Sequence, residues 1–314
     1  MLNWRGRKKS SASSIAVHLT SSGVALARVK RSENAPTLTF AEYRKVTASA
    51  DLPQTLAEIC RANDLDDCDC TAVLAIGDYT LVLVERPDVP SDELAEAVRW
   101  RIKDLVDFSP DEAAVEVFEV PDLRAGQAML YAVVARRENI QNTVAMLTDS
   151  GFQLDVIDIP EFAIRNIAMQ LPEDGAGAAF VYLEQSSGLI VITHQGTLFL
   201  SRRFDLGRQR LHASGHTAVS DEIEGLLDSI VIEVQRSLDY YESHFSRPPV
   251  SGIVVGPTGG HIEGMDSYLS SQLGIPARQI DYANIIEMEQ TPDTDLQAHC
   301  LAALGAALRR GEAA

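Results

Sequence analysis

The stretch IAVHLTSSGVALARV (residues 15–29) decides the fold, because it joins two apolar runs through a Ser-Ser-Gly turn. The same turn chemistry returns in FVYLEQSSGLIVI (residues 180–192). Two apolar runs on either side of a glycine-containing turn are typical of a β-hairpin. Gly23 and Gly188 lie about half the chain apart, and repetition at that spacing predicts a duplicated two-domain fold rather than a short repeat.

Composition restricts the class of protein. The chain has 314 residues, of which 46% are apolar and 23% charged, as in a globular protein large enough for two cores. It has no apolar run of about 18 residues and no secretory leader, so we expect a cytosolic protein. The net charge of −18 argues against nucleic acid as a partner, since affinity for phosphate backbones comes mainly from Lys and Arg.

The N-terminal residues and the four cysteines give no sign of a catalytic or metal site. Residues 1–14 contain Trp4 and four basic residues, and we expect a flexible basic tail, with contact to an anionic membrane surface as the alternative. The four cysteines lack the paired spacing of a zinc site, so we interpret them as reduced thiols: Cys60, Cys68, Cys70 and Cys300.

Residues 15–173 are predicted to form the first domain, of α/β type. Strands near 15–29, 37–46, 71–76 and 79–85 would pack against a helix near 52–63. An α+β unit is inserted at about residues 86–159. Its first helix would be capped by Ser91 and would bury one apolar face, Leu94, Val98, Ile102 and Leu105. Two strands, a helix that ends at Gly151 and a strand over 154–159 would complete it.

Residues 178–314 are predicted to form the second domain. It opens with the repeated hairpin and continues with a long helix from about 221 to 244, which Ser220 would cap. A strand over 250–255 then enters the glycine-rich turn GPTGG (residues 256–260). The last helix, near 296–310, would pack back on the first domain.

Several strings occur in an order that resembles the PilM family of type IV pilus assembly proteins, within the actin and hexokinase superfamily. They are LAEAVRW (94–100), YAVVAR (131–136), SGF (150–152), IPEFA (159–163), RFDLG (203–207) and EVQRSLDYY (233–241). The resemblance covers nearly the whole chain and is greatest for members that serve mannose-sensitive haemagglutinin (MSHA) pili. It implies a two-domain actin-like α/β fold with an inserted subdomain of the PilM 1C type.

The nucleotide motifs of that superfamily are degenerate here. In ATP-binding relatives the first turn reads approximately Asp-x-Gly-Ser-x-x-x-Lys, whereas this chain has His18, Thr20 and Ala25 at the Asp, Gly and Lys positions. Tyr182 replaces the corresponding Asp of the second turn, and Pro257 removes a backbone donor from the third. The resemblance places a degenerate cleft at Thr20, Ser21, Ser22, Gly23, Glu184, Glu233, Gly256, Gly259 and Gly260. We expect no hydrolysis, no cofactor and no metal ion.

Three single features have two interpretations each. His18 lies in an apolar strand, where a core histidine is more common than a catalytic one. Glu233 could face a nucleoside, as in relatives, or pair with Arg236 on its own helix. Gly259 and Gly260 could approach a phosphate, or the helix-entry turn could need glycine for its geometry alone.

The resemblance also implies a partner. In PilM relatives a short apolar N-terminal segment of the membrane protein PilN docks between two subdomains. We therefore expect a PilN-like inner-membrane partner, which would be like MshJ or MshK in an MSHA system, and a groove lined by Leu83, Pro87, Val89, Trp100 and Arg101. A PilO-like protein, a pilus assembly ATPase and a second copy of this chain are further candidate partners.

Three functions remain open from the sequence. The leading one is a scaffold of a pilus assembly platform, associated with the inner membrane through its partners. The alternative is a nucleotide-switching ATPase of pilus assembly, type II secretion or cell division, which would need Asp78 and Asp205 to fold into the cleft. A filament former is the third.

Overall fold

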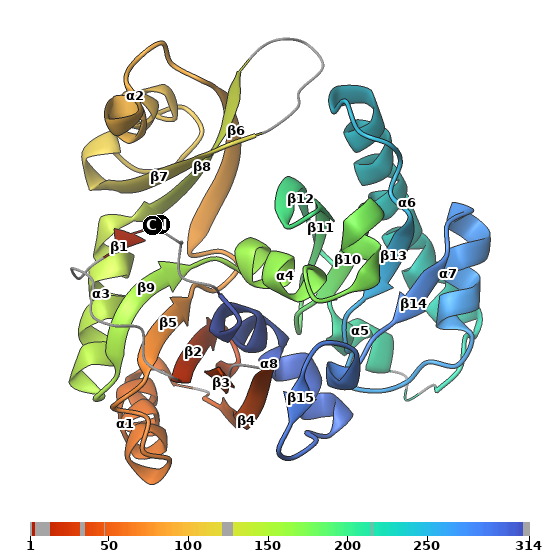
Figure 1. Ribbon diagram of the computed structural model, residues 1–314, viewed down its shortest axis with the longest axis horizontal. Helices are drawn as coiled ribbons and strands as arrows, with labels where there is room; N and C mark the ends of the chain where they lie inside the picture. The colour runs from red at the N-terminus through yellow and green to blue at the C-terminus, as the bar shows by residue number, and fades with distance from the viewer. Residues whose placement is uncertain are drawn as a thin grey trace.

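The computed structural model describes residues 2–3, 13–31, 35–46, 48–120, 128–213, 215 and 217–309. Its largest sheet has seven strands in the order β1-β9-β5-β2-β3-β4-β15 (Figure 1). The strands are β1 (Leu2–Asn3), β2 (Ser13–Thr20), β3 (Gly23–Arg31), β4 (Pro36–Lys45), β5 (Asp69–Val73), β9 (Gln153–Asp158) and β15 (Glu287–Met288). Helices α1 (Leu52–Ala62) and α3 (Arg137–Asp149) pack together beside it.

The second sheet repeats the plan of the first. Its order is β12-β11-β10-β13-β14, with strands β10 (Ala178–Leu183), β11 (Gly188–His194), β12 (Thr197–Phe204), β13 (Gly252–Val255) and β14 (Ala277–Gln279). In each sheet three antiparallel strands follow one another, and the first then pairs in parallel with the strand after a helix: β2 with β5, and β10 with β13. The predicted duplication is therefore confirmed. Helices α5 (Arg208–His212), α6 (Asp221–His244) and α7 (Met265–Leu273) belong to this half.

A separate three-stranded sheet has the order β6-β8-β7. It comprises β6 (Tyr79–Glu85), β7 (Ala113–Glu119) and β8 (Met129–Arg136), with α2 (Leu94–Arg101) packed on β7. Two placements from the sequence were wrong. The strand near 79–85 belongs to this sheet, and the strand near 154–159 is β9 of the main sheet, where it pairs in parallel with β5. Strand pairing across long loops leaves no local signal, so periodicity could not assign these strands. The domain limits themselves stay a prediction.

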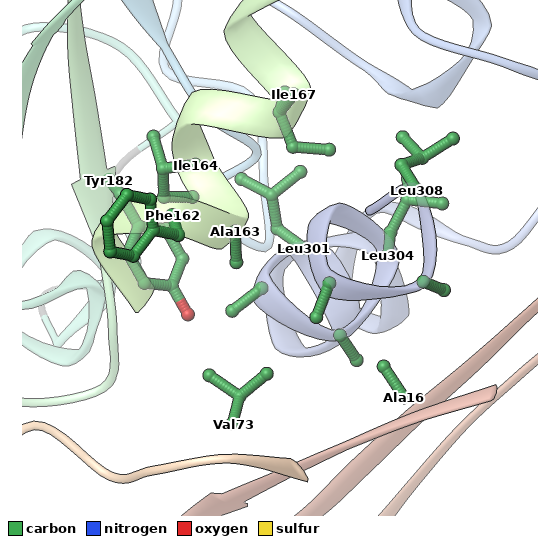
Figure 2. Close-up of a cluster of buried hydrophobic side chains, with 14 of the residues drawn as sticks. Ala16, Val73, Phe162, Ala163, Ile164, Ile167, Tyr182, Leu301, Leu304 and Leu308 are labelled. Carbon is green, nitrogen blue, oxygen red and sulfur yellow. The ribbon is translucent and has the colours of Figure 1, made fainter. Parts of the chain in front are cut away.

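Helices α4 (Pro160–Ala168) and α8 (Thr294–Ala307) occupy the centre of the molecule. Helix α8 packs against β2, β3 and β4 and also against α4. Figure 2 shows their apolar side chains facing one another, with Leu301 and Leu304 of α8 opposite Ala163 and Ile167 of α4. A Cβ on Gly305 would lie 2.1 Å from the Ala163 carbonyl oxygen, so the two helices cross in direct backbone contact there.

Local signals at the helix ends were partly misleading. Leu94, Val98 and Ile102 are buried as predicted, but Leu105 is 53% exposed because α2 ends at Arg101. Ser91 begins a 3-10 turn ahead of α2 instead of capping it. Ser220 precedes α6, yet its side chain makes no capping hydrogen bond.

The predicted tail over 1–14 also needs correction. Leu2–Asn3 form β1 at the edge of the main sheet, and Ser13 and Ser14 already belong to β2, while residues 4–12 lie outside the described part of the chain. Among the described helices, none is both long enough and apolar enough to cross a bilayer.

Candidate functional site

The cleft between the two Ser-Ser-Gly hairpins is the first candidate site. His18, at 0% exposure in β2, places Nε2 3.3 Å from Oε1 of Glu184, which follows β10. The first hairpin thus meets the second through these two side chains.

The hydroxyl groups of the first turn are used within the turn itself. Thr20 donates its Oγ1 proton to the Gly23 carbonyl oxygen at 2.9 Å. The Tyr43 hydroxyl lies 3.1 Å from the Ser22 carbonyl oxygen and 3.0 Å from its Oγ. Ser21 is exposed at the tip. The turn therefore has few polar groups left for a ligand.

The glycines of the cleft make room for this chain rather than for a phosphate. A Cβ on Gly23 would lie 2.1 Å from the Arg44 carbonyl oxygen, and one on Gly256 would lie 2.8 Å from Leu301 of α8. At Gly259, where φ is +92°, a Cβ would lie 3.1 Å from Asp295. At Gly260 it would approach His212 to 3.0 Å, so packing alone accounts for glycine at each position.

Charged and aromatic side chains that sequence reasoning missed line the same cleft. Arg208, which is nearly buried, lies 3.2 Å from the Asp295 carboxylate and donates to the His299 ring, with Nη2 2.6 Å from Nδ1. The His299 ring stacks on Tyr43 with centroids 3.5 Å apart. Burial and the nearby Arg208 cation lower the pKa of His299 to about 4, so the ring is neutral and can accept this hydrogen bond at physiological pH.

A cavity of about 210 Å³ remains beside this network. It is lined by Gln185, Arg208, Gln209, His212, Gly259, Asp295 and His299. Only Arg208 could have been suspected from the sequence, because it directly follows the RFDLG string. Asp295 and His299 reach the cavity through the packing of α8, which leaves no local sequence signal.

These residues do not fit magnesium and ATP. Tyr182, which the resemblance places at the Asp position of the second turn, is buried in the core. Asp78 and Asp205 are exposed, and neither lines the cavity. Glu233 accepts a hydrogen bond from Arg236 at 2.7 Å on the exposed side of α6. Within the described residues no group of three His, Cys, Asp or Glu side chains is placed to hold a metal ion.

The second candidate site is an apolar groove along β9. Two cavities, of about 230 and 600 Å³, share Ala114, Ile140 and Ile157. The smaller is also lined by Leu74, Val117, Phe118, Val133, Ile159 and Phe162, and the larger by Val144, Ala145, Phe152, Leu154 and Val156. Together they form a mostly apolar hollow between the three-stranded sheet, α3 and the edge of the main sheet.

One buried acidic group faces the smaller cavity. Asp158, at 3% exposure, accepts a hydrogen bond from the Ile159 backbone N–H at 2.9 Å through Oδ1. Its other oxygen, Oδ2, makes no hydrogen bond within the described chain and lies 3.8 Å from Nε of Arg309. Burial raises the pKa of this carboxyl above its usual range. Asp158 therefore offers a buried hydrogen-bond acceptor in a hollow whose other polar lining residues include Glu116, Arg137 and Arg309.

The five residues predicted to line a partner groove lie elsewhere. Trp100 is 55% exposed on α2, and Arg101 donates to the Glu85 carbonyl oxygen at 3.1 Å. Pro87 is buried, Val89 packs in the core under α2, and Leu83 packs toward the second half of the molecule. None of the five lines either cavity along β9.

Comparison with known proteins yields no match to a family model or to a curated protein. Among solved structures, a chain of the PilM–PilN type IV pilus biogenesis complex is similar, with a TM-score of 0.71 at 20% identity over 94% of this chain and 97% of that one. The cytoplasmic domain of EpsL, an inner-membrane component of the type II secretion system of Vibrio cholerae, has a TM-score of 0.52 at 12% identity, covering 95% and 96%. The chain therefore has the two-domain actin-like α/β fold that the sequence predicted, and it shares this fold with a chain of the PilM–PilN complex.

Proposed function

We propose that the chain is a PilM-like scaffold of the inner-membrane assembly platform of a type IV pilus, and specifically the MshI-type protein of an MSHA pilus system. It would act in the cytoplasm, attached to the membrane only through its partners. Its principal partner would be a PilN-like protein such as MshJ, with MshK- or PilO-like proteins and the assembly ATPase as further contacts. Self-association into a homodimer is compatible with this role.

The observation that carries the proposal is the apolar groove along β9. Its two cavities have volumes of about 230 and 600 Å³, and their lining comes from both the main sheet and the inserted sheet. Burial of an apolar peptide segment there would stabilise a complex by roughly 25 cal/mol for each Å² of apolar surface removed from water. The Asp158 carboxylate would favour a segment that presents an N–H or O–H donor.

We further propose that the protein is a pseudo-ATPase, which works without nucleotide. The contact between His18 and Glu184, the packed glycines and the Arg208 network support this, since each occupies space or uses polar groups that a nucleotide would need. A micromolar site is worth about 8 kcal/mol, and loss of several hydrogen bonds to charged groups at about 1.5–3 kcal/mol each would remove most of it. The rival, a nucleotide-switching ATPase, predicts binding that depends on magnesium.

The groove is tested by titrating the N-terminal segment of the PilN-like protein onto three variants. Ile140, which lines both cavities, is changed to Asp or, as a volume-matched control, to Leu. We expect Ile140→Asp to weaken binding at least about tenfold, equivalent to 1.4 kcal/mol, and Ile140→Leu to leave it nearly unchanged. Trp100→Ala tests the surface inferred from the sequence. Weakening by Trp100→Ala together with no effect of Ile140→Asp would place the partner on α2 instead.

A further inference from the structure

We propose that the outer edge of β9 is a strand-docking site, and that the chain's own N-terminal segment, Leu2–Asn3, occupies it and competes with any partner segment. The partner half of this inference rests on the proposed function. The occupancy by Leu2–Asn3 does not.

Sheet order provides the first argument. Strand β9 is inner only because β1 covers it; without β1 it would be the edge of the main sheet. The pairing is antiparallel, with Leu2 opposite Ile157 and Asn3 opposite Val156. An open edge presents a row of unpaired N–H and C=O groups, which an extended segment can satisfy as an added strand.

The two cavities provide the second argument, because they adjoin at this edge through Ala114, Ile140 and Ile157 and each borders a different core. The smaller is lined by Phe162, Ile159 and Leu74, which belong to the core shared with α4 and α8. The larger is lined by Phe152 and Leu154, which belong to the core under α1. Successive side chains of a strand point to opposite faces. A strand added on β9 would therefore direct alternate side chains into the two cavities.

The position of β1 coincides with this site. Ile157 lines both cavities, and it is the residue opposite Leu2. An extended partner segment that filled both cavities would pair with the same backbone as β1. The two cannot be bound at once.

The lengths of the strands explain why β1 can be displaced. Strand β9 has six residues, and β1 pairs with two of them. A longer segment could pair with the whole of β9 and fill the cavities as well. When an internal segment leaves the site free for only a fraction of the time, the apparent affinity for a partner falls to that fraction of its intrinsic value. If the edge is free about a tenth of the time, removal of β1 raises the affinity about tenfold.

The occupancy is tested without any partner, by hydrogen exchange of the segment 153–158. The double variant Leu2→Pro/Asn3→Pro removes both backbone donors of β1 from the full-length chain. The control, Ser10→Pro/Ser11→Pro, places two prolines in the same N-terminal region but outside β1. We expect faster exchange in 153–158 for the first variant only. Equal exchange in the wild type and both variants would overturn the proposal, whatever the partner turns out to be.

Three further measurements test the mechanism. A synthetic peptide of residues 1–12 should bind the chain that lacks these residues and not the full-length chain; failure to bind the shortened chain would overturn the proposal. Protection of 153–158 that grows with protein concentration would also overturn it, since the segment would then be docking on a second copy. For a PilN-like segment, we expect about tenfold tighter binding to the Leu2→Pro/Asn3→Pro variant than to the wild type.

Discussion

At the residue scale, polar side chains from distant parts of the chain contact one another at the centre of this molecule. The network of Arg208, Asp295 and His299 shows this in the cleft between the two hairpins. The absence of the motif aspartates could be predicted from the sequence, because His18 and Tyr182 stand at known positions of the motif. The contacts that fill this region could not be predicted. Tyr43 and His299, for example, are far apart in the chain and stack on one another only because of how α8 packs.

A second matched cluster joins the inserted sheet to both halves. Glu161 of α4, with no exposed surface, accepts a hydrogen bond from the Tyr79 hydroxyl at one oxygen. Its other oxygen lies 3.5 Å from the Arg203 guanidinium, which also stacks over the Tyr79 ring at 4.1 Å. Burial raises the pKa of Glu161, while Arg203 acts in the opposite direction.

Removal of Arg203 should therefore destabilise the protein. We expect Arg203→Ala to lower the free energy of unfolding at pH 7.5 by about 3 kcal/mol, because a buried carboxylate loses its cation. In this variant the folded protein holds the Glu161 proton more tightly than the unfolded chain, so stability falls as pH rises above the ordinary value of about 4.3. Urea unfolding at pH 5 and 7.5 measures this slope. Glu161→Gln added to Arg203→Ala should recover part of the loss, and no recovery would contradict the account.

At the element scale, the repeated hairpins, α1, α6 and α8 followed from local patterns, since their apolar runs and periodicity are continuous in the sequence. Strands β6 and β9 did not, because the sheet that a strand joins depends on distant partners. Helix capping also could not be predicted from residue type alone. Ser220 has the right residue type before α6 and makes no cap, whereas Asp293 accepts a hydrogen bond from the Leu296 N–H at 2.8 Å and caps α8.

These two positions form a matched pair of substitutions. Asp293→Ala should lower the free energy of unfolding by about 1 kcal/mol, the usual cost of a lost helix cap. Ser220→Ala should change it by less than about 0.5 kcal/mol, because no hydrogen bond is lost. Urea denaturation of both variants decides the matter. A larger effect at Ser220 than at Asp293 would contradict the assigned caps.

At the scale of the whole molecule, two duplicated sheets meet on α4 and α8, and the inserted sheet stands over the edge of the first (Figure 1). Side chains cross the cleft between the two hairpins, while two cavities lie along β9. The fold class could be predicted from the sequence. The location of the groove could not be predicted, because β7, α3 and β9, which come from separate parts of the chain, converge to form it.

This arrangement predicts no thermal stabilisation by nucleotide. A ligand present at 100 times its Kd stabilises a protein by about 2.7 kcal/mol, so 1 mM ATP at a 10 μM site would raise the Tm by several degrees. We expect no rise in Tm with 1 mM ATP and magnesium. A rise that requires magnesium would support the ATPase alternative.

The central claim, a scaffold whose partner groove works without nucleotide, is tested most directly by calorimetric titration of the PilN-like N-terminal segment onto the full-length chain. The titration is made with and without magnesium and ATP. The account predicts saturable binding with the same Kd in both conditions. Absence of binding, or a Kd that changes when nucleotide is added, would contradict it.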